Sequence, residues 1–325
     1  MRVLATLGCL SLAASLPAQN YIETFPFPDG TGTTVKIPLW TPQTGKWVIQ
    51  NKRLVQTGGA TWSYITSDRF TGVADCVLDV DVYYGATTAL YFGGTCARHP
   101  GNGSTTNLVM CKIQDNSTGG SFNRTFLYEQ PGGSVYYDIS PVTKAATVRM
   151  FVKGNQAWCE TDGNKDGTFE QKSAVRTLVN VANNTGMVGI SGYNAVELDD
   201  FKYYRGMLVE DATTTPKIGT TYKMTFSAPL ENSNPTPWLG LCSLGRAGIP
   251  IGGVTIPLTL DALLVNSLGF GWSGVLTSTS PTATIPLAIP NDSSLVGLNL
   301  WVAALTFGSG GFGSVSNDHH VQVVQ

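Results

Sequence analysis

The sequence has few charged residues and few histidines. Asp, Glu, Lys and Arg make up 13% of the 325 residues, where about 25% is usual in soluble domains, and the formal net charge is only -2. Nucleic-acid-binding domains carry a basic excess on one face, so nucleic acid is excluded as the expected partner. The sequence also lacks an HExxH motif, a GxSxG elbow and a phosphate-binding loop. It therefore lacks the motifs of zinc peptidases, α/β-hydrolases and nucleotide-binding enzymes.

Long hydrophobic runs are absent beyond the N-terminus. Arg2 is followed by fourteen uncharged, mostly apolar residues from Val3 to Leu16, and then by Pro17 and Ala18. This layout is typical of a signal peptide, and we expect cleavage after Ala18. No later segment reaches the roughly 18 apolar residues that a membrane span needs. We therefore expect an exported protein without a membrane span, secreted or at the cell surface, in an extracellular or periplasmic location.

Cysteines are few and odd in number after the signal peptide. Export permits disulfides, and the remaining cysteines are Cys76, Cys96, Cys111, Cys159 and Cys242. The first four allow three pairings. Because a Gly-, Asn- and Ser-rich loop separates Cys96 from Cys111, we favour Cys96–Cys111 together with Cys76–Cys159. The alternative is that all five are small buried hydrophobic residues.

The scarce charges divide the chain into two parts. Residues 216–325 contain seven charged side chains, whereas residues 19–215 contain 34. The polar segment 210–216 lies at the change in composition, as is typical of a domain boundary. We expect a signal peptide over 1–18, a first domain over 19–206, a linker over 207–215 and a second domain over 216–325.

Glycine, proline and short alternating runs are abundant. In the segment Cys76–Val82, apolar residues alternate with Asp79 and Asp81, which predicts a strand with one buried face. Similar short runs recur in both domains between clusters of Gly, Ser, Asn and Pro. No long helical stripe with caps occurs, so both domains are predicted to be all-β.

The first domain resembles the concanavalin A-like jelly-roll modules of the laminin-G and family-16-glucanase-like group over residues 21 to about 206. The residues that carry the resemblance are Glu23-Thr24-Phe25, Gly45 to Ile49, Arg53 to Gln56, Ala146 to Phe151, Gly186 to Ile190 and Leu198 to Phe201. The resemblance implies a two-sheet jelly roll that commonly binds carbohydrate or protein and sometimes hydrolyses glycosides. The catalytic ExDxxE strand of the glucanases is absent.

The second domain is similar to a C-terminal module common in secreted proteins of planctomycete-type bacteria. The residues behind this similarity are Trp238 to Leu241, Gly248 to Pro250, Ile289 to Asn291, Leu295 to Gly297 and Ser316-Asn317. The similarity implies a smaller β-sandwich with an accessory or sorting role.

One short segment has the oxygen ligands of a calcium loop. Asp162, Asn164 and Asp166 alternate and are followed by Gly167, as in the first half of such a loop. The twelfth position is a serine instead of a bidentate glutamate, although Glu170 at position nine could contribute. Calcium is therefore a candidate structural ion, and the alternative is a hairpin turn rich in Asp, Asn and Gly.

Two consecutive carboxylates, Asp199 and Asp200, interrupt the last strand of the first domain. Neighbouring residues of a strand point to opposite faces, so one carboxylate would be buried. A buried carboxylate needs a partner. An ion shared with Glu23 is one candidate for this partner, and the alternatives are a salt bridge or a bulge that faces solvent.

Sugar binding requires exposed aromatic faces, because pyranose rings stack on them. The candidates are Trp62, Tyr83, Tyr84, Tyr91, Tyr136 and Tyr137. In the adjacent pairs Tyr83-Tyr84 and Tyr136-Tyr137, strand geometry forces one ring outward.

The sequence therefore favours a non-catalytic, lectin-like protein that binds extracellular glycan or another cell-surface ligand. One alternative is a glycoside hydrolase whose carboxylate pair is drawn from Asp79, Asp81, Glu129 or Glu160. The other is a purely structural component of the cell surface.

Overall fold

The structure is a computed structural model that describes residues 21–325 except 33–35, 60, 86–89, 116–119, 183, 231–234, 252–253 and 309–310. The expected signal peptide over 1–18 lies outside the described residues. Strands dominate the described part, with one six-residue helix, α1 (Ala262–Ser267), and one 3-10 turn, η1 (Ser293–Leu295). The all-β prediction is confirmed. Within the same residues, no helix has both the length and the apolar composition to cross a membrane.

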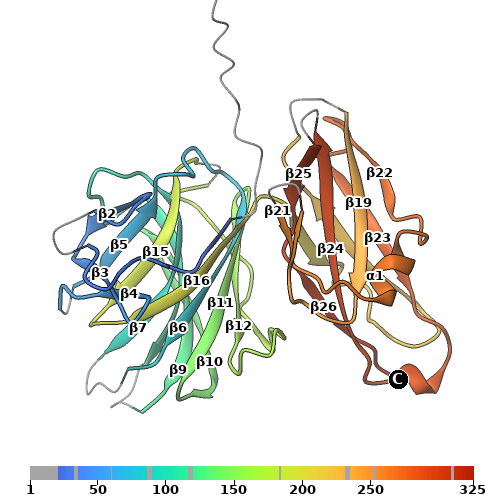
Figure 1. Cartoon of the computed structure of the whole chain (residues 1–325), viewed down its shortest axis with the longest axis horizontal. Helices are drawn as coiled ribbons and strands as arrows, with labels where there is room; N and C mark the ends of the chain where they lie inside the picture. The colour runs from blue at the N-terminus through green and yellow to red at the C-terminus, as the bar shows by residue number, and fades with distance from the viewer. Residues whose placement is uncertain are drawn as a thin grey trace, which may run out of the picture.

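The first part of the chain is a sandwich of two antiparallel sheets (Figure 1). Among the described residues, nine strands form one sheet, in the order β13-β12-β11-β6-β16-β4-β3 with β1 added to β16 and β14 to β12. These strands are β1 (Tyr21–Glu23), β3 (Trp47–Gln50), β4 (Arg53–Gln56), β6 (Cys76–Tyr83), β11 (Ala145–Lys153), β12 (Gln156–Asp162), β13 (Gln171–Lys172), β14 (Arg176–Thr177) and β16 (Glu197–Tyr204).

The opposite sheet has seven strands within the described residues, in the order β10-β9-β8-β7-β15-β5-β2. They are β2 (Trp40–Thr44), β5 (Ser63–Ser67), β7 (Tyr91–His99), β8 (Leu108–Asp115), β9 (Phe122–Gln130), β10 (Gly133–Val142) and β15 (Met187–Tyr193). Strands that are distant in the sequence lie side by side, as in a jelly roll: β16 joins β6 to β4, and β15 joins β7 to β5.

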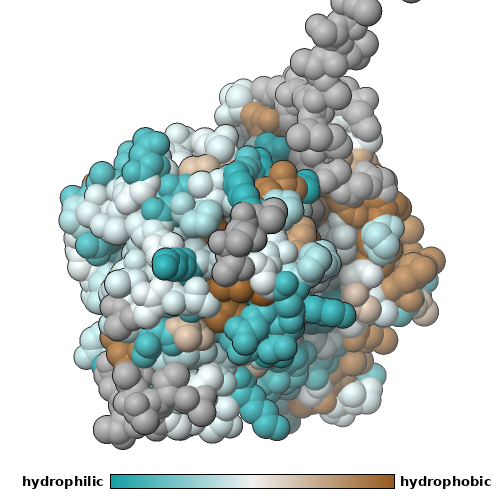
Figure 2. Space-filling model, turned by 60° about the vertical axis from the view of Figure 1, so that its left-hand side comes forward, coloured by the Kyte–Doolittle hydropathy of each residue, from teal (hydrophilic) through white to brown (hydrophobic). Residues whose placement is uncertain are grey.

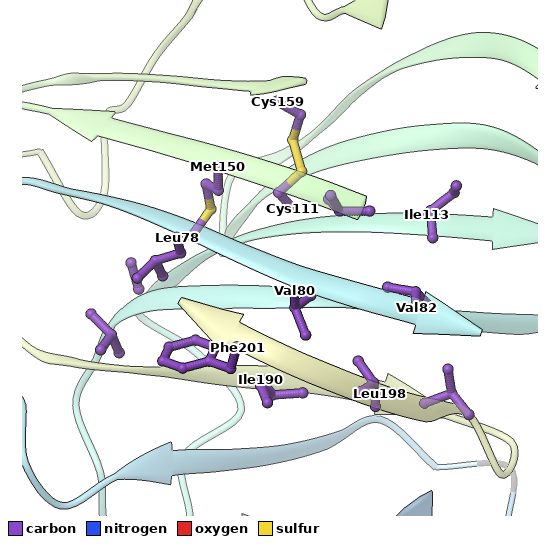
Figure 3. Packing of buried hydrophobic residues seen from close by; sticks show 14 of the residues in the cluster. Leu78, Val80, Val82, Cys111, Ile113, Met150, Cys159, Ile190, Leu198 and Phe201 are labelled. Carbon is purple, nitrogen blue, oxygen red and sulfur yellow. A yellow bond between two sulfur atoms is a disulfide. The ribbon is translucent and has the colours of Figure 1, made fainter. Parts of the chain in front are cut away.

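Alternation along the strands builds the core between the sheets. Leu78, Val80 and Val82 of β6 point inward, where they meet Ile190 of β15 and Phe201 of β16 (Figure 3). All of these side chains are fully buried. Full burial of one such side chain stabilises the fold by about 1.5–3 kcal/mol.

A disulfide links the two sheets through this core: Cys111 of β8 is bonded to Cys159 of β12 (Figure 3). Both predicted pairings are therefore wrong. Cys96 lies opposite Met110 in the β7–β8 register, so its side chain points to the outer face while that of Cys111 points inward. Cys76 is separated from Cys159 by the intervening strand β11. Cys76, Cys96 and Cys242 are free and buried.

The second part of the chain is a smaller β-sandwich. Three strands form one sheet of the described structure: β17 (Met207–Glu210), β18 (Thr221–Ser227) and β23 (Thr282–Ala288). Another sheet contains β19 (Thr236–Ser243), β22 (Ser273–Leu276), β24 (Asn299–Gly308), β25 (Gly311–Val315) and β26 (His319–Gln322), and a small ribbon pairs β20 (Ile249–Ile251) with β21 (Val254–Ile256). Side chains of the two larger sheets share one core. Strand β17 occupies the beginning of the expected linker, because its backbone pairs with β18.

The second part packs on the side of the nine-stranded sheet (Figure 1). Gly206 forms a parallel bridge with Ser316, and the Asn317 side chain both accepts from the Leu208 N–H and donates to the Leu208 carbonyl. Arg149 of β11 reaches Asp318. The outer face of the seven-stranded sheet lies on the far side of the sandwich from these contacts.

Candidate functional site

Aromatic side chains gather on the outer face of the seven-stranded sheet. We call this group the aromatic face, and it consists of Trp62, Phe92, Phe126, Tyr128, Tyr136 and Tyr193. Ring centroids are 5.2 Å apart for Trp62 and Phe92, 5.4 Å for Trp62 and Tyr128, and 5.5 Å for Phe126 and Tyr136. The rings lie together because β9 directs Leu127 into the core and therefore its neighbours Phe126 and Tyr128 outward.

The rings of the aromatic face differ in exposure. Tyr136 is 58% exposed, Trp62, Tyr128 and Tyr193 are half-buried, and Phe92 and Phe126 are buried. Four of the six rings therefore offer apolar surface to a ligand. Figure 2 shows one side of the first part, whose surface is mostly teal to white with small brown patches.

A buried lysine lies beneath the aromatic face. Lys112 of β8 is 2% exposed, and its Nζ lies 3.8 Å from the ring centroid of Phe92, 4.5 Å from Trp62, 5.0 Å from Phe126 and 5.1 Å from Tyr128. Burial lowers the pKa of the Lys112 ammonium to about 7. Interactions with the four rings stabilise its charged form. Sequence reasoning missed Lys112, although its position between the inward residues Cys111 and Ile113 could have indicated the outer face.

The six predicted sugar-binding aromatics lie in different places. Trp62 and Tyr136 belong to the aromatic face. Tyr83 lies half-buried on the outer face of the other sheet, with the Arg53 guanidinium 3.5 Å from its ring centroid.

The other three predicted aromatics lie away from the aromatic face. Tyr91 is fully buried between the sheets, and Tyr84 and Tyr137 pack against the same core. The Tyr137 hydroxyl is 3.0 Å from Thr161 Oγ1. Strand alternation correctly predicted that Tyr136 and Tyr137 point to opposite faces of the sheet. The sequence did not show which ring of the pairs Tyr83-Tyr84 and Tyr136-Tyr137 faces outward.

The loop after β12 brings three carboxylates together. One ligand oxygen each of Asp162, Asp166 and Glu170 lies within 4.8 Å of the others. The Asp162 carboxylate accepts the Gly167 N–H at 2.8 Å through Oδ2, while its buried Oδ1 has no hydrogen-bond partner. Burial raises the pKa of Asp162 to about 6. A buried carboxylate that has an unpartnered oxygen and lies close to two further carboxylates is an environment that a cation would stabilise.

Turn geometry shapes this loop. Asn164 accepts the Asp166 N–H at 2.9 Å through Oδ1, and Asp166 accepts the Thr168 N–H at 2.7 Å. Gly167 has φ +94°, a value that favours glycine. The sequence motif therefore forms a compact turn in which three carboxylate oxygens lie close together. The turn agrees with the hairpin interpretation of the motif, and the clustered oxygens agree with the calcium-loop interpretation.

Glu23 does not face Asp199 and Asp200. Its Oε2 accepts from the Tyr21 hydroxyl and, at 3.4 Å, from Trp40 Nε1. These three carboxylates do not form a metal-ligand cluster among the described residues. Asp200 instead adopts φ +48° in a bulge of β16, where the register with β6 shifts. Of the arrangements considered from the sequence, the structure therefore shows the bulge.

The bulge brings its two carboxylates near a third on β6. Asp199 lies opposite Asp81 in the strand register, and Lys165 forms an ion pair with Asp81. Burial, followed by the charges of Asp200 and Asp81, raises the pKa of Asp199 to about 6 despite the hydrogen bond from the Asp200 N–H. Burial and the charge of Asp81 likewise raise the pKa of Asp200.

The other carboxylates considered for catalysis are engaged in the fold. Asp79 accepts two hydrogen bonds from the Arg149 guanidinium, at 2.7 and 2.8 Å. Glu129 Oε1 accepts the backbone N–H groups of residues 179–181. Glu160 accepts from Trp158 Nε1 at 3.3 Å and lies 3.8 Å from Lys172 Nζ. Asp81, by contrast, lies beside the two carboxylates of the β16 bulge.

Comparison with known proteins yields structural neighbours only. No family model matches the chain, and no curated protein matches its sequence. The Ca²⁺-bound exoplasmic/lumenal domain of VIP36 is 13% identical over 57% of this chain and 89% of its own, with a TM-score of 0.40. A glycosyl hydrolase family protein from Mycobacterium fortuitum is 14% identical over 57% of this chain and 98% of its own, with a TM-score of 0.38.

A third neighbour is a β-1,3-1,4-glucanase (lichenase) derived from a mouse hindgut metagenome. It is 9% identical over 57% of this chain and 98% of its own, with a TM-score of 0.39. These identities and TM-scores are too low to carry a functional argument.

Proposed function

We propose that this protein is an exported, non-catalytic carbohydrate-binding protein and that the aromatic face is its glycan-binding surface. The observation that carries the proposal is the group of four partly exposed rings on one sheet face, with Tyr136 58% exposed and Trp62, Tyr128 and Tyr193 half-buried. The C–H faces of pyranose rings stack on aromatic rings, which provide a large contact area at low entropic cost.

The position of the rings suits an extended glycan. Trp62 lies beside β5, whereas Tyr128 and Tyr136 lie on β9 and β10. The ring centroids of Trp62 and Tyr128 are nevertheless 5.4 Å apart, so an extended chain of sugars would meet these rings in succession.

Polar groups at the edge of the face can bind sugar hydroxyls. Arg124 lies 4.2 Å from the Tyr136 ring centroid and donates to Asp138 at 2.7 Å. A guanidinium paired with a carboxylate offers donors and an acceptor side by side. Such a pair orients a sugar that the rings hold by stacking.

Calcium is proposed as a structural ion of the Asp162 loop. Asp162, Asp166 and Glu170 would supply carboxylate oxygens, and Asn164 an amide oxygen, which are the ligands that calcium prefers. The support is the unpartnered Oδ1 of Asp162, which is buried beside the other carboxylates.

The test is a glycan array probed with the purified full chain. Trp62→Ala and Tyr136→Ala should abolish or strongly reduce the signals of the wild-type protein. Tyr83→Ala is the matched control, because it removes a half-buried aromatic ring from the outer face of the other sheet. Absence of glycan binding by the wild type, or an equal loss in the control, would contradict the proposal.

A second candidate function is glycoside hydrolysis at the carboxylates of β6 and β16. The observation that favours it is Asp199, whose pKa is raised to about 6 beside Asp81, because a general acid of this reaction needs a raised pKa. Release of reducing ends from a polysaccharide by the wild type, with loss of the activity in Asp199→Asn, would support hydrolysis. Equal activity of the two proteins would exclude Asp199 as the acid.

A further inference from the structure

A cavity of about 740 Å³ lies between the two parts of the chain. Its wall includes Tyr21, Phe70 and Tyr203 of the first part, and Met207, Ser227 and Pro281 belong to the following segment and the second sandwich. Ligand pockets have volumes of about 300–1,000 Å³ and occur preferentially at domain interfaces. The cavity therefore has the size and position of a binding site.

Three cationic side chains line this cavity: Arg69, Lys153 and Arg205. In the described structure none of them forms a salt bridge, whereas many other basic side chains do. Asp75 is the acidic residue in the wall, and its Oδ1 already accepts the Gly154 N–H at 2.8 Å and lies 3.5 Å from Arg98. The lining thus carries an excess of positive charge that is available to a ligand.

Aromatic rings form one wall of the same cavity. Phe70 stacks on Tyr203 with centroids 4.2 Å apart, and the Tyr21 ring meets Phe70 edge-on at 5.5 Å. Arg69 lies 4.7 Å from the centroid of Tyr21. A ligand in this cavity therefore meets an apolar wall and cationic groups together.

We propose that the cavity binds an acidic saccharide, a sugar that carries a carboxylate or sulfate. The anionic group would lie among Arg69, Lys153 and Arg205, since guanidinium groups bind planar anions through two parallel hydrogen bonds. The sugar ring would contact the wall of Tyr21, Phe70 and Tyr203. A neutral sugar would leave the three cations without a counter-charge, so the site discriminates by charge.

This site is separate from the aromatic face. The cavity is lined by residues at the junction with the second part, whereas the aromatic face lies on the seven-stranded sheet. The inference does not rest on the proposed function, because either surface can bind its ligand if the other does not.

Calorimetric titration of the full chain with three probes tests the inference: an oligogalacturonate, a sulfated galactan oligosaccharide and a neutral cello-oligosaccharide. At least one acidic probe should bind, and the neutral probe should not displace it. The triple variant Arg69→Gln, Lys153→Gln and Arg205→Gln should bind the acidic probe about tenfold more weakly, as expected for three partly exposed charge contacts. Raised salt should weaken wild-type binding.

The matched control removes three positive charges elsewhere, with Lys46→Gln, Lys144→Gln and Lys223→Gln, all of them exposed side chains. It should retain wild-type affinity. An equal loss in the control would show non-specific attraction and overturn the proposal, as would failure of both acidic probes to bind.

Hydrogen exchange on the wild-type protein provides a test that needs no variant. The bound acidic probe should slow amide exchange in residues 71–75, which line the cavity. Protection confined to the seven-stranded sheet would place the acidic sugar on the aromatic face and contradict the inference.

Discussion

Arg149 and Asp318, 169 residues apart in the sequence, form a buried ion pair with a distance of 2.6 Å between Nη2 and Oδ1. The same guanidinium holds Asp79 of the neighbouring strand at 2.7 Å, and Arg246 Nε lies 3.2 Å from the other oxygen of Asp318. Two carboxylates and two guanidinium groups thus alternate from β6 through β11 into the second part. This network joins the two sandwiches.

Replacing Arg149 with alanine should destabilise the protein strongly. Asp79 would remain buried without its guanidinium partner, and Asp318 would keep only Arg246; removal of one partner from a buried ion pair costs about 3–5 kcal/mol. Arg53→Ala is the control, because its partner Glu197 is about one third exposed and such pairs contribute about 1 kcal/mol or less. Urea denaturation measures both, and similar losses in the two variants would argue against a strong role for the network.

The interface should weaken in acid. Burial alone would raise the pKa of Asp318, but the positive charges of Arg149 and Arg246 outweigh it and lower the pKa to about 2. Since the unfolded value is about 3.9, this carboxylate contributes stability above about pH 4, and the contribution is lost as the pH falls from about 4 to 2. The free energy of unfolding, measured across this range, should fall less steeply in Asp318→Asn than in the wild type.

Calcium should raise the melting temperature through the Asp162 loop. At a concentration a hundredfold above Kd, a bound ion adds about 2.7 kcal/mol, which corresponds to about 5–10 °C for a sandwich of this size. Asp166→Ala should abolish the increase, whereas Asp138→Ala, which removes a carboxylate outside this loop, should preserve it. Thermal melts with calcium and with EDTA measure the effect, and identical melts of the wild type would contradict a calcium site.

Lys112→Met should stabilise the fold at neutral pH. Burial lowers the pKa of Lys112 to about 7, below the unfolded value of about 10.4. The unfolded chain therefore binds more protons between these values, and wild-type stability should rise with pH from about 7 to 10. Methionine keeps the apolar stem and removes the titrating group. Denaturation at several pH values should show that the free energy of unfolding rises less with pH in the variant than in the wild type. An equal rise in the two proteins would mean that other groups cause the pH dependence.

Local patterns in the sequence predicted the strands and one turn. Leu78, Val80 and Val82 face the core as their alternation indicates, because side-chain direction in a strand depends only on the backbone period. The Asp162 loop is compact for a similar reason: its oxygen-bearing residues lie within nine positions of one another. Tyr136 and Tyr137 point to opposite faces, as adjacent strand residues must.

Only the tertiary structure decided which distant residues meet. The partner of Cys111 depends on which strand of the opposite sheet lies across the core. The four rings around Lys112 come from Trp62, which precedes β5, and from β7 and β9. Asp318 lies beside Arg149 only because the two parts of the chain pack against each other. The physical reason is that side-chain alternation is a local property of the chain, whereas strand order and register result from packing of the whole core.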